Sequence, residues 1–248
     1  MIVLELCIIV ASACLCIILL RSDIHATLPA FSRYVFFQTF ASIASLSIYS
    51  IGGRTYFVTY YVLILFGCIL AAVAAGELAI QLLGPSGALP DWVHKRRTLM
   101  AGTGIAAALA AAFPLWASHG ETHVRACILA EQWMAGALWV TFTLIFIFWR
   151  TLKVFRRQTR AALICFGFVL YFTVCSITVF FRGRGGLEAA IAARYAGMGS
   201  YLLTLLVWTG ALLMKAPVFK KATPEKVEIV MKDFEDEKEA VITAAAAQ

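Results

Sequence analysis

Residues 56–83 read YFVTYYVLILFGCILAAVAAGELAIQLL, and Glu77 is the single charged side chain in this stretch. A helix rises about 1.5 Å per residue and the hydrocarbon layer of a bilayer is about 30 Å thick, so about 20 apolar residues are enough to cross it. The stretch therefore predicts a membrane-spanning helix that is long enough to tilt or to project beyond the bilayer.

Six further stretches meet the same requirement. They are 3–20, 34–52, 99–117, 127–149, 161–181 and 196–214. Hydrophobic residues make up 62% of the chain and charged residues 14%, whereas soluble domains are about 45–50% apolar and about 25% charged. The sequence therefore predicts an all-α polytopic membrane protein, with a seven-transmembrane helix bundle over residues 1–215.

The positive charge is divided unevenly between the two sets of loops. One set includes the clusters at 95–97 and 150–160. The other set contains only Arg54, Arg125, Arg182, Arg184 and Arg194. Because cytoplasmic loops carry the excess of Lys and Arg, the N-terminus is expected outside and the tail, 216–248, in the cytoplasm. The basic residues lie between apolar runs and not on one basic face, so no nucleic-acid partner is expected.

The tail differs in character from the spans. After Thr223-Pro224, apolar residues recur at helical spacing, and mostly acidic residues follow. This pattern is typical of a short amphipathic helix over 224–239, which would dock on a cytoplasmic or membrane protein partner. The alternative is a frayed tail.

The lysine that retinal would need and the histidines that haem would need do not lie inside the predicted spans. Lys215 lies at the end of the last span, not at its middle, where retinal would need a Schiff base. The four histidines, His25, His94, His119 and His123, all lie in predicted loops, which argues against intramembrane haem. The His119–His123 cluster lacks the HExxH spacing. No cofactor, no metal and no catalytic residue is therefore predicted.

The sequence predicts two carboxylates at membrane depth, Glu77 and Glu131. Carboxylates are costly there and are functional candidates by default. Glu77 lies towards the cytoplasmic side, where a structural ion pair with Lys95, Arg97 or Arg150 is expected. Glu131 lies about one turn from the outer surface, within reach of an external ligand.

Polar side chains also recur on single faces of three spans. In the second span, Gln38, Ser42, Ser45 and Tyr49 follow one another at steps of three and four. Tyr171, Cys175 and Thr178 repeat the pattern in the sixth span, and Tyr201, Thr204 and Trp208 in the seventh. A polar, ligand-binding cup open to the outside is predicted from Glu131, Gln132, Tyr49, Tyr60, Thr178, Arg182 and Tyr201. The alternative is that the hydroxyls only join helices by hydrogen bonds.

Small residues in the third and fourth spans predict close packing. The third span carries alanines between Ala71 and Gly76, and the fourth carries Gly102, Gly104 and an alanine-rich run. Small residues let helices approach closely in lipid, so these two helices are expected to pack together.

In its number of spans, its short loops, Glu77 and the aromatic last span around 201–208, the chain has a recognisable plan. It resembles the seven-helix N-terminal modules of some bacterial sensor histidine kinases, and stand-alone seven-span bacterial membrane proteins. No kinase domain follows residue 215. The resemblance implies a multi-pass protein of the bacterial inner membrane, a non-enzymatic sensor or complex subunit that signals through a partner. The alternatives are a small-solute transporter and a lipid-modifying membrane enzyme.

Overall fold

The computed structural model describes residues 2–22, 24–49, 53–83, 102–109, 123–151, 159–184 and 187–214. Within these helical segments, only the backbone is described at residues 2, 49, 53–55, 57–58, 123–126, 182–184, 187 and 190. The predicted tail helix over 224–239 lies outside the described residues, as do most of 99–117.

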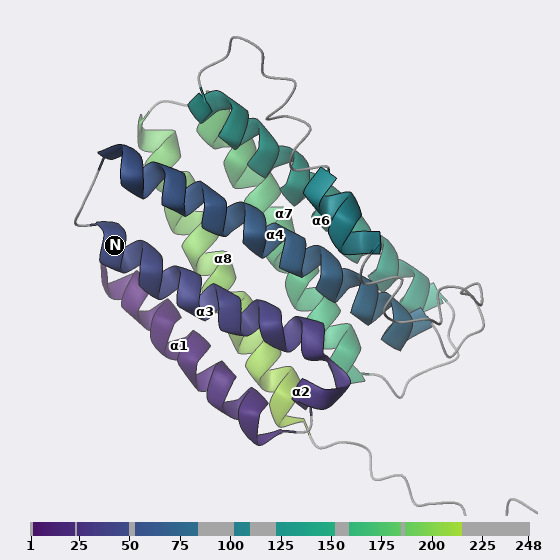
Figure 1. The fold of residues 1–248 in the computed structure, drawn as a ribbon. Coiled ribbons are helices and arrows are strands. Elements are labelled where there is room, and N and C mark those ends of the chain that lie inside the picture. Colours follow the sequence, from purple (N-terminus) through teal and green to yellow (C-terminus); the bar gives the residue numbers. More distant parts are fainter. Residues whose placement is uncertain are drawn as a thin grey trace, which may run out of the picture. The chain divides into compact units, whose positions relative to one another are not determined.

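The described part of the chain is helical throughout (Figure 1). Its elements are α1 (Ile2–Arg21), the one-turn α2 (Ile24–Thr27), α3 (Pro29–Tyr49), α4 (Gly53–Leu83), α6 (His123–Thr151), α7 (Thr159–Arg184) and α8 (Leu187–Leu213). The long helices pack in a closed ring in which α1 contacts α3, α3 contacts α4, α4 contacts α6, α6 contacts α7, α7 contacts α8, and α8 returns to α1. Residues 102–109 form a further helical segment.

Five of these helices contain segments that are long and apolar enough to cross a membrane. The segments are Val3–Arg21, Thr59–Leu83, Cys127–Thr151, Thr159–Phe181 and Ile191–Leu213. The described part of the chain is therefore that of a helical membrane protein. Helix α3 is long enough to span, but Arg33, Gln38 and its serines make it less apolar than the other five.

The helix bounds differ from the predicted spans mainly at loops. Helix α3 begins at Pro29, five residues before the predicted start, because proline suits the first helical position, where no backbone donor is needed. Helix α7 continues through Gly183 to Arg184, where a turn was predicted, and α8 begins at Leu187. The early part of α8 contains good helix formers and has Glu188 in its first turn, where a negative charge suits the helix dipole.

Contacts between helix termini define two ends of the ring. At the Glu5 end, Glu5 near the start of α1 contacts Arg194 in the first part of α8. At the Glu77 end, Glu77 near the end of α4 contacts the start of α3. Tyr60 near the start of α4 and Glu131 near the start of α6 line the same cavity as Glu5. Helices α4 and α6 therefore both begin at the Glu5 end.

An aromatic cluster fills the ring towards the Glu77 end. Phe168 of α7 stacks on Phe142 of α6 at 4.3 Å between ring centroids, and it lies 4.8 Å from Trp208 of α8. Phe31 of α3 meets the same indole edge-on at 5.2 Å. Trp208 is fully buried, and its Nε1 donates to the Ile164 carbonyl at 3.0 Å. These rings close the Glu77 half of the bundle with dense packing.

The indole fits only because α7 has a glycine beside it. A Cβ on Gly167 would lie 2.3 Å from Trp208 Nε1. Thr204, one turn before Trp208, donates to the Gly167 carbonyl at 3.3 Å. Helices α7 and α8 are therefore joined by two side chain to backbone hydrogen bonds across a close approach.

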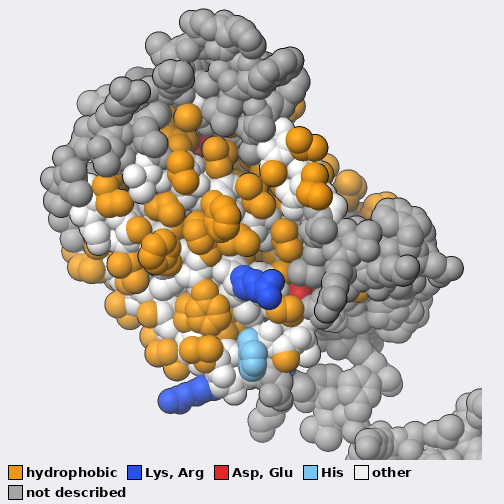
Figure 2. All heavy atoms as spheres, in the orientation of Figure 1, with side chains coloured by type: hydrophobic (Ala, Val, Ile, Leu, Met, Phe, Trp, Pro, Cys, Tyr) orange, Lys and Arg blue, Asp and Glu red, His pale blue; other side chains and the backbone are white. Residues whose placement is uncertain are grey.

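The outer surface of the described helices carries many large apolar side chains. Large side chains such as Val3, Phe40 and Leu206 are at least 60% exposed, and Figure 2 shows hydrophobic side chains spread over one face of the helices. Basic side chains and a histidine appear on that face near α2. Helices that are apolar on all sides are typical of a membrane protein.

Close packing between the predicted third and fourth spans is confirmed where it is described. A Cβ on Gly104 would meet Val73 Cγ2 of α4 at 3.2 Å, and Ala107, one turn later, is buried in the core. The absence of a side chain at Gly104 therefore permits the approach.

Candidate functional site

A cavity of about 260 Å³ lies inside the ring, in the half nearer the Glu5 end. All six long helices of the ring contribute to its wall, each through the part that lies in that half of the bundle. Its polar and charged lining residues are Glu5, Gln38, Ser42, Ser45, Glu131, Thr178 and Arg194, and its tyrosines are Tyr34, Tyr56, Tyr60, Tyr171 and Tyr201. The volume approaches the roughly 300–1,000 Å³ of small-molecule sites.

Four of the seven residues predicted for the cup line this cavity. They are Glu131, Tyr60, Thr178 and Tyr201. Gln132 is half-buried in α6 but is not among the lining residues. Tyr49 and Arg182 lie in α3 and α7, and their side chains are outside the described set.

The polar helical faces converge as expected in two of the three spans. Gln38, Ser42 and Ser45 of α3 line one wall, and Tyr171, Cys175 and Thr178 of α7 line another. The face on α8 divides. Tyr201 lines the cavity, whereas Thr204 and Trp208 bond to the backbone of α7.

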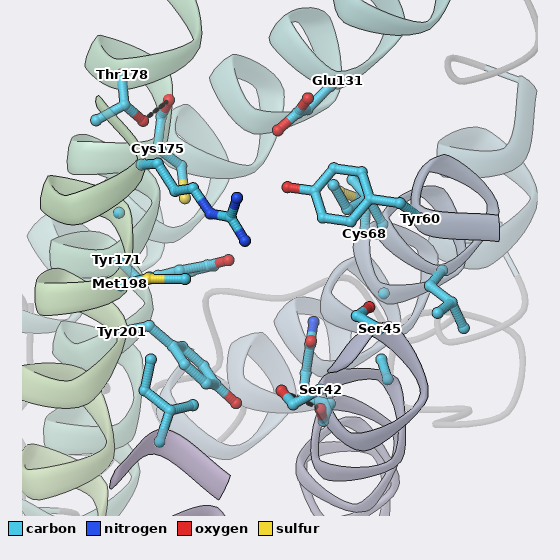
Figure 3. Close-up of a pocket in the computed structure, with 18 of the residues that line it drawn as sticks. Ser42, Ser45, Tyr60, Cys68, Glu131, Tyr171, Cys175, Thr178, Met198 and Tyr201 are labelled. Carbon is cyan, nitrogen blue, oxygen red and sulfur yellow. Dashed lines mark hydrogen bonds between the residues drawn. The ribbon is translucent and has the colours of Figure 1, made fainter. Parts of the chain in front are cut away.

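Figure 3 shows the centre of the site. The carboxylate of Glu131 and the hydroxyls of Tyr60 and Tyr171 point into the same space from α6, α4 and α7. Ser42 and Ser45 face them from α3. Glu131 is only 8% exposed. The site thus brings one carboxylate and several hydroxyl oxygens to a common volume.

Two charged residues in the wall were not predicted. Arg194 Nη2 donates to Glu5 Oε1 at 2.8 Å, and these side chains remain 37% and 18% exposed. The prediction of two carboxylates at membrane depth was incomplete, because Glu5 also lies within an apolar segment able to span. Glu5 and Arg194 line the cavity near the starts of their helices, whereas Tyr34 and Tyr201 are buried deeper. The charged pair therefore marks the more exposed part of the cavity wall, and the two tyrosines its buried part.

The hydroxyls of the wall are oriented by their own helices. Ser42 Oγ donates to the Gln38 carbonyl at 2.9 Å, and Thr178 Oγ1 donates to the Cys175 carbonyl at 3.0 Å. Their protons are used in these bonds, so the oxygens present lone pairs to their surroundings. The buried hydroxyls of Tyr34 and Tyr201 have no hydrogen-bond partner among the described residues.

Glu77 does not line the cavity, and its carboxylate contacts the backbone at the start of α3. It is 1% exposed, and its Oε2 accepts hydrogen bonds from the backbone amides of Ala30 at 2.9 Å and Phe31 at 3.0 Å. These are among the amides that a helix start leaves unpaired, and a carboxylate there also suits the helix dipole. Gln81, one turn later, donates to the Thr27 carbonyl at 3.3 Å. Lys95 and Arg97, two of the basic partners predicted for Glu77, lie outside the described residues.

Within the described part of the chain, no group of three or more His, Cys, Asp or Glu side chains is placed to hold a metal ion. The cavity itself combines polar side chains, tyrosines on more than one wall and a closed floor of packed rings. Such a wall can bind and orient a small solute.

No known protein family matches the chain, and no curated protein or solved structure is significantly similar to it.

Proposed function

We propose that the protein is a seven-span sensory module of a bacterial inner membrane, with its N-terminus outside, which binds a small external solute in the cavity and acts through a partner protein. The observation that carries this proposal is the cavity, because polar faces of several helices meet there around Glu131 at the end predicted to face outwards. The resemblance to seven-helix kinase modules is consistent with it.

Two features of the ring support seven spans and this orientation. Helices α4 and α6 start at the same end, so the end of α4 and the start of α6 lie at opposite ends of the bundle, as a further crossing over 99–117 requires. Arg21, Arg33, Arg150 and Arg160 lie at helix termini of the Glu77 end. The other end has Arg54, Arg125, Arg182, Arg184 and Arg194, so the excess that the positive-inside rule needs comes from the basic residues that the sequence adds to the Glu77 side at 95–97 and 153–157.

The aromatic cluster favours a sensor over a small-solute transporter, the second candidate. A transported solute must pass Phe31, Phe168 and Trp208, which are fully buried and in mutual contact below the cavity. A solute that only binds needs no such passage. The partner contact is assigned to the tail at 224–239, as the sequence predicts.

The proposal is tested by filling the cavity. Ser45 lines it, whereas Ser47 of the same helix is exposed, so Ser45→Phe and Ser47→Phe form a matched pair. The unfolding temperature of purified protein is measured with ethanolamine hydrochloride, glycine, glycerol or sodium acetate at millimolar concentration. We expect at least one probe to raise it for the parent and Ser47→Phe but not for Ser45→Phe.

If none of the four probes stabilises the parent, or if Ser45→Phe responds as the parent does, the binding function is refuted. Counterflow in proteoliposomes then separates the two candidates. A bound probe that also exchanges across the membrane would replace the sensor with a transporter.

A further inference from the structure

We infer that the buried end of the cavity binds a ring-bearing carbonyl compound, an uncharged molecule whose oxygen accepts hydrogen bonds from Tyr34 and Tyr201. This inference rests on the proposed binding function and specifies the ligand class for the same site. It comes from the two buried hydroxyls and from the aromatic side chains that surround them.

The two hydroxyls belong to side chains that line the cavity and are almost fully buried. Tyr34 of α3 is 1% exposed and Tyr201 of α8 is 8% exposed. Gln38 lies near the hydroxyl of Tyr34 and Ser12 near that of Tyr201, but neither pair is in hydrogen-bonding geometry. Figure 3 shows the Tyr201 hydroxyl directed across the cavity towards Ser42. Within the described part of the chain, the hydrogen bonds of both phenol groups are therefore not made, although buried polar groups normally have partners.

An unused hydroxyl proton selects an oxygen acceptor. Each tyrosine hydroxyl carries one donor, and Tyr201 is close enough to Tyr34 for the two hydroxyls to interact electrostatically. A carbonyl oxygen has two lone pairs and no proton, so one carbonyl can accept from both hydroxyls. A ligand group that only donates, such as an ammonium, would leave both protons unused.

Burial favours an uncharged acceptor. An ionised group that moves from water into a protein interior loses far more hydration free energy than a carbonyl, whose lost hydrogen bonds the two hydroxyls replace. Tyr34 also packs on the aromatic cluster below the cavity, with ring centroids 5.1 Å from Phe168 and 6.0 Å from Trp208. A carbonyl group therefore suits this end of the cavity better than a carboxylate does.

The aromatic side chains favour a ring as the body of the ligand. The ring centroids of Tyr171 and Tyr201 lie 5.3 Å apart, and Phe172, which also lines the cavity, lies 5.1 Å from Tyr171. Aromatic rings pack favourably against one another in offset or edge-on arrangements. A protein cavity of about 150 Å³ can bind benzene. The volume of about 260 Å³ therefore leaves room for a ring with a short carbonyl substituent.

The test compares four probes built on the same ring. They are acetophenone, its alkene analogue isopropenylbenzene, sodium benzoate and benzylamine hydrochloride. The first two have nearly the same shape and differ in the replacement of the carbonyl oxygen by a methylene group. Binding to the full-length protein is measured by equilibrium dialysis in dodecyl maltoside, with protein-free micelles as the reference. We expect acetophenone to bind saturably, and benzoate and benzylammonium to show no saturable binding.

Variants assign the effect to the two hydroxyls. In Tyr34→Phe and in Tyr201→Phe, the ratio of acetophenone affinity to isopropenylbenzene affinity should fall about three- to tenfold, because one hydrogen bond is lost. The ratio cancels any general loss of apolar contact. Tyr195→Phe is the matched control, because Tyr195 is 46% exposed on α8 and does not line the cavity. Its ratio should stay within about twofold of the parent's.

The same variants make an independent prediction for the protein without ligand. Replacing a buried hydroxyl that has no partner removes a desolvation cost, so the unfolding temperature of Tyr34→Phe and Tyr201→Phe should equal or exceed that of the parent. A hydroxyl that joins helices would behave in the opposite way. A lower unfolding temperature together with an unchanged affinity ratio would assign both hydroxyls to helix packing and overturn the inference.

Ring carbonyls also occur in quinones that are dissolved in membranes. The dialysis is therefore repeated with decylubiquinone added to the micelles. A water-soluble ligand predicts no effect of the quinone on acetophenone binding, whereas a membrane quinone as ligand predicts competition. Both outcomes keep the specificity for a ring carbonyl and differ in its source.

The inference is overturned if the affinity ratio is unchanged in either variant, or if benzoate or benzylammonium binds as well as acetophenone. A response to glycerol or acetate that Ser45→Phe abolishes would then leave the proposed binding function intact with a different ligand class. Failure of acetophenone together with failure of the whole earlier panel would remove both.

Discussion

Replacing Gly167 with alanine should destabilise the bundle, although Gly167 lies in the middle of a helix where alanine is normally favoured. The new Cβ would lie 2.3 Å from Trp208 Nε1 and 2.8 Å from Cδ1. Ordinary carbon contacts are about 3.5–4.0 Å. The indole must therefore move, and it is fully buried among Phe31, Tyr34 and Phe168.

The expected loss combines three contributions. Overpacking of a well-packed core costs about 1–3 kcal/mol. Displacing the indole from the Ile164 carbonyl leaves a buried donor unsatisfied, which costs about 1–3 kcal/mol more. The helix propensity of alanine offsets about 1 kcal/mol of this loss. The free energy of unfolding should therefore fall by about 3 kcal/mol, within a range of about 1–5 kcal/mol.

The measurement is equilibrium unfolding in mixed micelles with increasing dodecyl sulfate, followed by helical circular dichroism. Gly210→Ala is the matched control, because a Cβ on Gly210 meets nothing within 4 Å. It should change stability by less than about 1 kcal/mol. Adding Trp208→Phe to Gly167→Ala should recover part of the loss relative to Trp208→Phe alone, with a coupling of about 1 kcal/mol or more. Equal stability of Gly167→Ala and Gly210→Ala would refute the assigned contact.

Three further predictions concern other parts of the ring. Glu77→Gln should lower the free energy of unfolding by about 1–3 kcal/mol, because two amides of α3 lose a charged acceptor; no loss in the same unfolding assay would remove the capping role. In a cysteine-free background, an impermeant maleimide should label Glu188→Cys in intact cells and Thr159→Cys only after permeabilisation, and the reverse pattern would invert the proposed topology. A double-mutant cycle with Glu5→Gln and Arg194→Gln should give a coupling below about 1 kcal/mol, because the pair is partly exposed; a much larger value would show that it holds the ring together.

Most of the helices could be predicted because membrane spanning depends on the length and polarity of one segment. The error at α3 arose because Arg33 interrupts the apolar pattern, although a long basic side chain is tolerated near a helix end where it reaches the interface. Gly183 was read as a turn, yet the helix continues through it. A prediction from local glycine content alone therefore placed the end of α7 too early in the chain.

The candidate site was predicted in part for a related reason. Helical spacing places Ser42 beside Ser45 and Cys175 beside Thr178 without any knowledge of neighbours. Spacing within one helix does not say which side chains meet across helices. The pairing of Glu5 with Arg194, 189 residues apart, and the fit of Trp208 against Gly167 both depend on the ring order. The two amide contacts of Glu77 could not be predicted, because backbone donors have no signature in sequence. The ion pair predicted for Glu77 with Lys95 or Arg97 stays a prediction, since those residues lie outside the described part of the chain.

The closure of the ring by α1 and α8 has a consequence for how the protein is made. Helix α1 is synthesised first and α8 last among the described helices, yet both supply the cavity wall through Glu5 and Arg194. Until α8 is inserted, the earlier helices leave this wall incomplete, and Trp208 is absent from the floor. A nascent chain that stops before residue 187 therefore cannot form the site. Ligand-dependent protection from proteolysis should first appear when the last helix leaves the translocon. The onset of this protection therefore reports when insertion of the described helices is complete.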